Sequence, residues 1–157
     1  MLYEVEGDLI NDKQFQIFCH QTNCKGVMGA GIAKQIADKY PFVQYKNSEY
    51  CRKKVLGTVL PVPVERERIC VNIYGQDDYG REAKVYTGYN AFKKALDQFA
   101  ERLNNSSIPR TWKIGFPFRI GCGHGHASWT KIRPMIEAFA GKVNQDVYIV
   151  RKGNYNE

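Results

Sequence analysis

Three histidines and a pair of adjacent aspartates are the side chains of this sequence best suited to general acid–base chemistry. His20 comes just before a glycine-rich turn, and His124 and His126 lie within a second one, where they can donate protons or line a phosphate pocket. Asp77 and Asp78 follow a predicted strand, where a carboxylate can take up a proton or orient water. A core position for His20 and solvent-exposed loops for the other four are the alternative interpretations. No carboxylate cluster accompanies the histidines, so no metal site is predicted.

Two glycine-rich turns surround these histidines. The first has glycines at 26, 29 and 31, after an apolar strand-like segment and before a helical pattern. The second, over 120–129, alternates three glycines with other residues before another helical pattern. Glycine lets the backbone approach a ligand, and the free N–H groups at a helix start attract anions. The pattern predicts a ligand that carries phosphate, although the first turn is neither a dinucleotide fingerprint nor a P-loop. Glycines that only permit tight turns are the alternative.

Length and composition predict one globular domain over 1–157. The chain has 157 residues, of which 43% are hydrophobic and 25% charged, and it has no long apolar run. The N-terminal residues have no secretion signal, so a cytoplasmic protein is expected. The five cysteines form no CxxC pair, which argues against a disulfide framework or zinc site and leaves Cys122 as a small turn residue or a nucleophile. The net charge of +7 is scattered, so a small anionic ligand is favoured over a nucleic-acid surface.

Strands and helices alternate along the chain. Apolar alternation predicts strands at 2–6, 15–21, 57–64, 68–74, 113–117 and 146–151, with an edge position for the proline-containing 57–64. Helical spacing predicts helices at 30–40, 42–54 and 129–140, and a long helix capped by Thr87, with Pro134 delaying the regular start of the last one. This order predicts an α/β sandwich with helices on both sides of a central sheet. Its ligand is expected at the carboxyl ends of the strands, between the two turns.

Together these residues resemble the macrodomain family over nearly the whole chain. The dipeptide at 7–8 resembles the family's adenine-binding position, the run at 23–33 its first phosphate loop, and the run at 120–126 its second. Tyr148 matches a place where an aromatic residue lies beside the adenine. The resemblance implies a three-layer α/β/α fold with a central mixed sheet, and a binding site built from Asp8, Leu9, Asn23, Gly26, Met28, Gly29, Ala30, Gly31, Ile32, Ile120, Gly121, Cys122, Gly123, His124, Gly125, His126 and Tyr148.

The resemblance also implies a reaction. Fungal-type ADP-ribose 1″-phosphate phosphatases and hydrolases that remove ADP-ribose from acidic side chains are the two most similar branches. The second branch uses a lysine and an aspartate where this chain has Gln76 and Gly125. We therefore expect hydrolysis of an ADP-ribose derivative, with His20, Asp77 and His126 as catalytic candidates. A binding module without turnover is the alternative. No cofactor is expected. The expected partners are small ADP-ribose derivatives or ADP-ribosylated macromolecules. The protein is expected to be a monomer and not to bind a membrane.

Overall fold

A six-stranded mixed sheet forms the centre of the computed structural model, which describes residues 1–80, 82 and 84–153. The strands are β1 (Leu2–Glu6), β2 (Ile17–Gln21), β3 (Val59–Glu65), β4 (Arg68–Ile73), β5 (Lys113–Pro117) and β6 (Asp146–Arg151). Their order across the sheet is β1-β6-β5-β2-β4-β3. All neighbours are parallel except β3, which pairs with β4 in the antiparallel direction and lies at an edge. The predicted mixed sheet and edge strand are confirmed.

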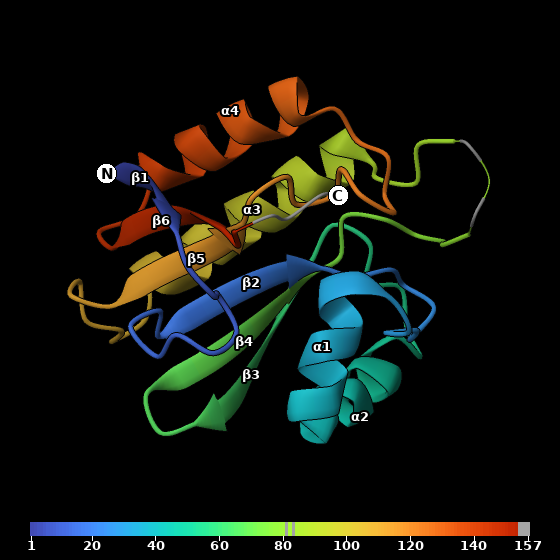
Figure 1. Cartoon of the computed structure of the whole chain (residues 1–157), viewed down its shortest axis with the longest axis horizontal. Helices are drawn as coiled ribbons and strands as arrows, with labels where there is room; N and C mark the ends of the chain where they lie inside the picture. The colour runs from blue at the N-terminus through green and yellow to red at the C-terminus, as the bar shows by residue number, and fades with distance from the viewer. Residues whose placement is uncertain (81, 83, 154–157) are drawn as a thin grey trace.

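Four helices cover the two faces of this sheet (Figure 1). They are α1 (Gly31–Lys39), α2 (Pro41–Tyr50), α3 (Tyr89–Asn104) and α4 (Trp129–Ala140). The alternation of side chains along β2 produces two separate cores: Ile17 and Cys19 pack with α3 and α4, whereas Phe18 packs with α1 and α2. The architecture is the predicted three-layer α/β/α sandwich. Within the described residues, no helix is both long and apolar enough to cross a membrane.

Three details of the helices differ from the sequence-based expectation. The second helix ends at Tyr50 rather than at residue 54. Thr87 does not cap α3, because Gly88 is the N-cap residue and the Thr87 hydroxyl donates to the Gly121 carbonyl at 2.9 Å. Pro134 lies inside α4, which begins at Trp129 without the expected delay. The Thr87 difference matters for the site, since a residue predicted to act locally instead makes a tertiary contact.

Candidate functional site

Both glycine-rich turns line a single cleft at the carboxyl ends of the parallel strands. The cleft has a volume of about 410 Å³, within the range of small-molecule sites. In Figure 1 the tip of β2 points toward the first turn of α1. Gln21, at the end of β2, and Gly31, at the start of α1, both line the cleft. The residues that line it are Gln21, Thr22, Asn23, Val27, Gly29, Ala30, Gly31, Ile32, Ala33, Gln76, Tyr79, Gly80, Pro117, Ile120, Gly121, Gly123, His124 and Gly125. The sheet topology thus brings together two turns that are nearly 100 residues apart in the sequence.

The first turn ends directly in the amino terminus of α1. Ala30 is the N-cap residue and makes no side-chain capping bond, so the helix start is open toward the cleft. The Asn23 side chain closes the turn itself: its Oδ1 accepts from Lys25 N at 2.9 Å and its Nδ2 donates to Val27 O at 2.9 Å. Since the first N–H groups of a helix have no partner within it, this end offers donors and a positive dipole to an anion.

Two glycines of the second turn are poorly replaced by other residues, Gly121 because of its backbone conformation and Gly125 because of the lack of space around it. Gly121 has a φ of +77°, a conformation that favours glycine. A Cβ atom on Gly125 would overlap the Thr87 hydroxyl and lie 2.5 Å from the Gly121 carbonyl oxygen. The Gly125 carbonyl accepts from the amides of Tyr86 and Thr87, at 2.9 and 3.1 Å. The segment after β4 therefore holds this turn against the end of the sheet.

Gln21, at the end of β2, connects the two halves of the cleft. Its Nε2 donates to Gln76 Oε1 at 2.7 Å and to Thr87 Oγ1 at 2.8 Å. The Gln76 amide in turn donates to the Asp78 carbonyl at 2.8 Å. The side-chain amides of Gln21 and Gln76 are thus joined by a hydrogen bond in the wall of the cleft. Gln21 also bonds Thr87, whose hydroxyl in turn bonds the Gly121 carbonyl of the second turn. Gln76 occupies the position at which the resemblance places a lysine in the related hydrolases. Its side-chain amide is hydrogen-bonded to Gln21 and to the Asp78 carbonyl.

A smaller cavity, here called the Asp8 cavity, lies beside the cleft. It is lined by Gly7, Asp8, Leu9, Ile10, Ile32, Gln35, Pro117, Val150 and Lys152. Ile32 and Pro117 line both spaces, so the two are neighbours. Partial burial raises the pKa of the Asp8 carboxyl, but hydrogen bonds from Asn11 and the nearby Lys152 ammonium outweigh it and hold that pKa below its ordinary value of 3.8. An ionised acceptor therefore lies at this end of the site.

His20 does not lie in the cleft, and the structure does not support its predicted acid–base role. The side chain is fully buried in β2, and its Nε2 is 2.6 Å from Asn72 Oδ1. Burial lowers the pKa of His20 from 6.5 to about 4, although the Asn72 hydrogen bond acts in the opposite direction. The imidazole is thus neutral near pH 7 and sealed from solvent, as in the alternative interpretation of a core histidine. The strand pairing that places Asn72 opposite His20 decides this outcome.

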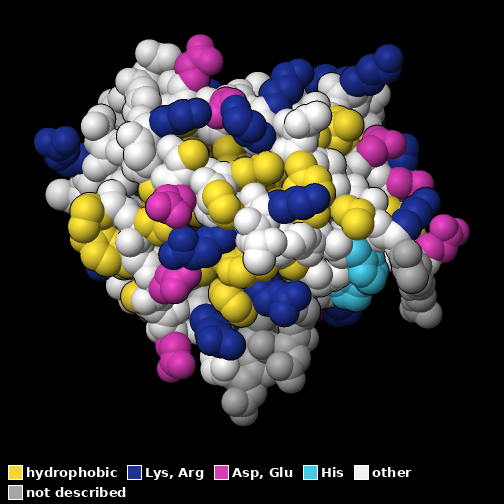
Figure 2. All heavy atoms as spheres, turned by 90° about the horizontal axis from the view of Figure 1, so that it is seen from above, with side chains coloured by type: hydrophobic (Ala, Val, Ile, Leu, Met, Phe, Trp, Pro, Cys, Tyr) yellow, Lys and Arg dark blue, Asp and Glu magenta, His cyan; other side chains and the backbone are white. Residues whose placement is uncertain are grey.

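The other acid–base candidates are exposed, but only one of them lines the cleft. His124 is part of the lining, whereas His126 lies outside it, with its ring 6.4 Å from that of Tyr86. Figure 2 shows histidine side chains on the molecular surface. Asp77 is also exposed and outside the lining, and its carboxylate is 3.5 Å from Lys25 Nζ. Among these candidates, His124 is the side chain that a ligand in the cleft can reach.

Four other predicted ligand contacts line neither the cleft nor the Asp8 cavity. Met28 is buried in the core beneath α1 and α2, and Gly26 packs its backbone near Ser48. Cys122 is buried, and burial raises its pKa to about 11, so its thiol is not a nucleophile at neutral pH. Tyr148 stacks on Tyr3 with ring centroids 5.2 Å apart and lines neither the cleft nor the Asp8 cavity.

Sequence reasoning missed several residues that line the two spaces. In the cleft they are Gln21, Thr22, Val27, Tyr79, Gly80 and Pro117, and in the Asp8 cavity they are Ile10, Gln35, Val150 and Lys152. A usable signal existed for Gln21 and Pro117, since each ends a predicted parallel strand. For Val150 and Lys152 no local signal existed, because the pairing of β6 with β1 brings them to Asp8.

The described lining of the cleft contains no Lys, Arg, Asp or Glu. Figure 2 shows Lys and Arg side chains interspersed with acidic and neutral ones over the face it presents. Among the described residues, no group of three or more His, Cys, Asp or Glu side chains is placed to hold a metal ion. The described lining therefore offers an anion backbone amides and the α1 dipole, and no Lys or Arg side chain.

Comparison with known proteins agrees with the fold described above. No family model matches the chain. Two ADP-ribose 1″-phosphate phosphatases are each 25% identical to it: the Saccharomyces cerevisiae protein over 92% of this chain and 96% of its own, and the Scheffersomyces stipitis protein over 96% and 100%. The macrodomain of Mycobacterium tuberculosis DarG superposes with a TM-score of 0.80 at 18% identity, over 98% of this chain and 99% of its own.

Two further solved structures extend the comparison. Thermosipho africanus DarTG in complex with ADP-ribose superposes with a TM-score of 0.79 at 18% identity, over 99% of this chain and 42% of its own. A macrodomain protein from Streptomyces coelicolor superposes with a TM-score of 0.76 at 22% identity, over 98% and 100%. The chain therefore has the macrodomain fold and is a distant homologue of the fungal ADP-ribose 1″-phosphate phosphatases.

Proposed function

We propose that this protein binds ADP-ribose or a derivative in the cleft and hydrolyses it, with ADP-ribose 1″-phosphate as the leading substrate. The observation that carries the proposal is the convergence of both glycine-rich turns on one cleft, beside a cavity with an ionised aspartate. ADP-ribose has a diphosphate between two sugars and a base at one end. The diphosphate matches the cleft between the two turns, and the base matches the Asp8 cavity beside it. The ADP-ribose complex of the similar DarTG fold and the activity named for the yeast relatives support the same ligand.

In the proposed complex, the diphosphate lies between the start of α1 and the second turn. Backbone N–H groups and the helix dipole supply the attraction, which is about 0.3–1 kcal/mol for an exposed helix end and up to about 2 kcal/mol where it is partly buried. The adenine enters the Asp8 cavity, where the carboxylate accepts a hydrogen bond from the exocyclic amine. The distal ribose and its phosphate then lie beside the second turn, close to His124.

Hydrolysis of the 1″-phosphate requires water to attack phosphorus while the bond from phosphorus to the sugar oxygen breaks. The departing sugar oxygen takes a proton from His124, our candidate donor because it lines the cleft, and the attacking water gives up a proton to solvent, from which His124 is reprotonated. His20 is excluded from this step by its burial. Removal of ADP-ribose from acidic side chains is the less favoured reaction, because the Gln76 amide is held by Gln21 and Asp78.

A binding module without turnover is the second candidate function. It is favoured by one observation: of the three residues that the sequence singled out for catalysis, His20 is buried, and Asp77 and His126 lie outside the cleft lining. In that case the same cleft would hold ADP-ribose, free or attached to a macromolecule, as a recognised signal.

Calorimetric titration with ADP-ribose, followed by a phosphate-release assay on ADP-ribose 1″-phosphate, tests both functions. Binding with catalytic release of phosphate supports the phosphatase. Binding with no release at high enzyme concentration leaves the binding module, and no binding refutes both. His124→Ala should lower turnover by about 10²-fold or more if it is the proton donor. His126→Ala, an exposed histidine two residues away and outside the lining, is the matched control.

A further inference from the structure

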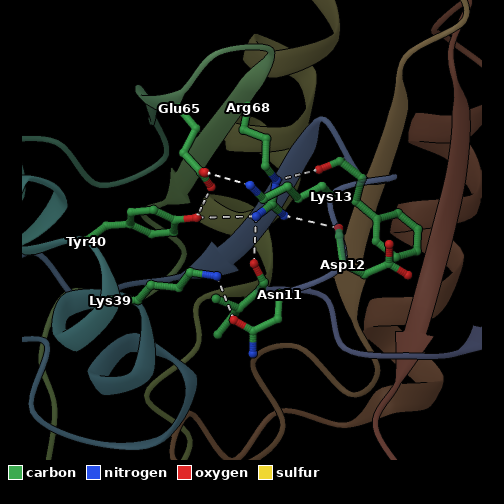
Figure 3. A network of polar contacts seen from close by, with 9 residues as sticks. Asn11, Asp12, Lys13, Lys39, Tyr40, Glu65 and Arg68 are labelled. Carbon is green, nitrogen blue, oxygen red and sulfur yellow. Dashed lines mark hydrogen bonds and ion pairs between the residues drawn. The ribbon is translucent and has the colours of Figure 1, made fainter.

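Arg68 is a buried cation that bonds a single loop. It is 2% exposed at the start of β4, and its guanidinium carbon lies 4.3 Å from the centroid of the Phe18 ring. Its nitrogens donate to four main-chain carbonyls of the β1–β2 connection, with Figure 3 showing the surrounding network. These are the carbonyls of Leu9 at 3.0 Å, Ile10 at 2.6 Å, Phe15 at 3.1 Å and Asp12 at 3.4 Å.

The charge of Arg68 has no direct carboxylate partner among the described residues. The Tyr40 hydroxyl lies 3.5 Å from Arg68 Nη1 and donates to Glu65, which also pairs with Lys13 at 3.1 Å. A buried guanidinium is costly unless hydrogen bonds satisfy it. Here the loop carbonyls supply those bonds, so the guanidinium and the loop conformation depend on each other. Arginine suits this task because its planar fork directs five N–H groups, whereas lysine has a single ammonium.

The loop that Arg68 holds carries the Asp8 cavity. Leu9 and Ile10, whose carbonyls accept from Arg68, directly follow Asp8 and line the cavity with it. The Asp8 carboxylate is fixed from the other side by the backbone and side-chain nitrogens of Asn11, at 3.2 and 2.9 Å. Arg68 itself does not line the cavity. Any influence of Arg68 on a ligand must therefore pass through the position of this loop.

We propose that Arg68 is a positioning residue that sets the base preference of the site by fixing the loop of Asp8. The inference rests on the proposed function, because it assumes that an adenine amine donates to Asp8. With Arg68 in place, the carboxylate is held where it accepts that hydrogen bond. Without it, the loop carbonyls lose their donors and the carboxylate loses its fixed position, while both glycine-rich turns keep theirs.

The test compares two ligands in calorimetric titrations: ADP-ribose and its hypoxanthine analogue, in which a carbonyl oxygen replaces the amine. We expect the wild type to prefer ADP-ribose by about 10- to 100-fold, the value of a hydrogen bond to a charged group. Asp8→Asn should remove most of this preference. Arg68→Lys should lower the preference for ADP-ribose over the analogue to about threefold or less. The affinity of this variant for the hypoxanthine analogue should stay within about threefold of the wild-type affinity.

The ratio of affinities separates positioning from a general loss of folding. A purely structural role would weaken both ligands equally and leave the ratio at its wild-type value, which would overturn the proposal. Ile136→Val, a buried change in α4 on the opposite face of the sheet, is the control and should leave the ratio unchanged. If Arg68→Lys does not fold, Arg68→Gln replaces it, because the glutamine amide can donate to only part of the four loop carbonyls; an unchanged ratio in that variant also overturns the proposal.

Failure of this inference is distinguishable from failure of the proposed function. If the wild type binds neither ligand, the proposed function fails. If it binds both equally, the assignment of Asp8 to adenine fails. If the wild type prefers ADP-ribose, Asp8→Asn loses the preference and Arg68→Lys keeps it, only the role of Arg68 is refuted.

Discussion

Burial of His20 makes the stability of this protein depend on pH in a defined window. The folded chain holds the imidazole neutral down to a pKa of about 4, whereas the unfolded chain takes up a proton near the ordinary value of 6.5. Between these values the unfolded state binds more protons, so the free energy of unfolding falls as the pH is lowered through the window. The difference between the two pKa values corresponds to about 3 kcal/mol, because one pKa unit is about 1.4 kcal/mol.

The variant His20→Gln isolates this contribution. Glutamine can place a nitrogen near Asn72 Oδ1, the partner of His20 Nε2, and it does not titrate. Urea unfolding of both proteins from about pH 7.5 to about pH 4 should show the wild type losing about 3 kcal/mol more than the variant. Any constant loss of stability caused by the substitution cancels in this comparison. Parallel curves for the two proteins would refute the argument from burial.

The same variant also tests whether His20 takes part in turnover. If the wild type releases phosphate, His20→Gln should keep kcat within about threefold, because no substrate atom reaches the buried ring. A general acid or base contributes about 10²–10⁴ in rate, so a loss of that size would restore the catalytic role that the sequence predicts. Measuring kcat for both proteins at a saturating substrate concentration, with each protein shown to be folded, separates loss of catalysis from loss of stability.

Three further predictions concern the cleft. In calorimetry, Gly125→Ala should weaken ADP-ribose binding by about 5- to 150-fold, because overpacking against Thr87 costs about 1–3 kcal/mol. Gly141→Ala is the control and should bind as the wild type does, because a Cβ atom there meets nothing closer than 3.5 Å. Because the described lining holds no charged side chain, the Kd for ADP-ribose should change by less than about tenfold between about 50 and 200 mM salt, while a polyanion held by six or more lysine or arginine contacts would lose about 10³-fold. Cys122, whose pKa burial raises to about 11, should react with iodoacetamide at about pH 8 far more slowly than a free thiol, and Cys122→Ser should keep ligand binding; fast labelling measured by mass spectrometry would contradict its burial.

Local patterns predicted most of the fold. The last two strands, 113–117 and 146–151, match their predicted bounds because apolar residues and flanking turn residues mark both ends. Both glycine-rich turns were identified from their residue types and their position between strand and helix. Their convergence on one cleft also followed from the sequence, since parallel strands place their carboxyl ends together.

Side-chain roles that depend on strand pairing were not predictable in the same way. His20 and Gln21 are neighbours in β2 and therefore point to opposite faces, so one enters the core and the other reaches the cleft. The sequence shows this alternation but not which neighbour faces which side. Thr87 has the residue type of a helix cap, and only the folded chain reveals that the Gly121 carbonyl competes for its hydroxyl. Long-range partners decided each of these cases.

The proposed recognition of a diphosphate by a cleft whose described lining has no Lys or Arg depends strongly on the residues that hold the cleft in shape. Backbone donors bind only where the backbone is held, because an amide that moves by a fraction of an ångström loses the directionality of its hydrogen bond. Thr87 and Gln21 hold the second turn, Asn23 closes the first, and Arg68 holds the loop of Asp8. Affinity and specificity should therefore depend on the residues that hold the backbone as well as on those that contact the ligand. A search for functional variants limited to the cleft surface would miss two of these residues, Thr87 and Arg68.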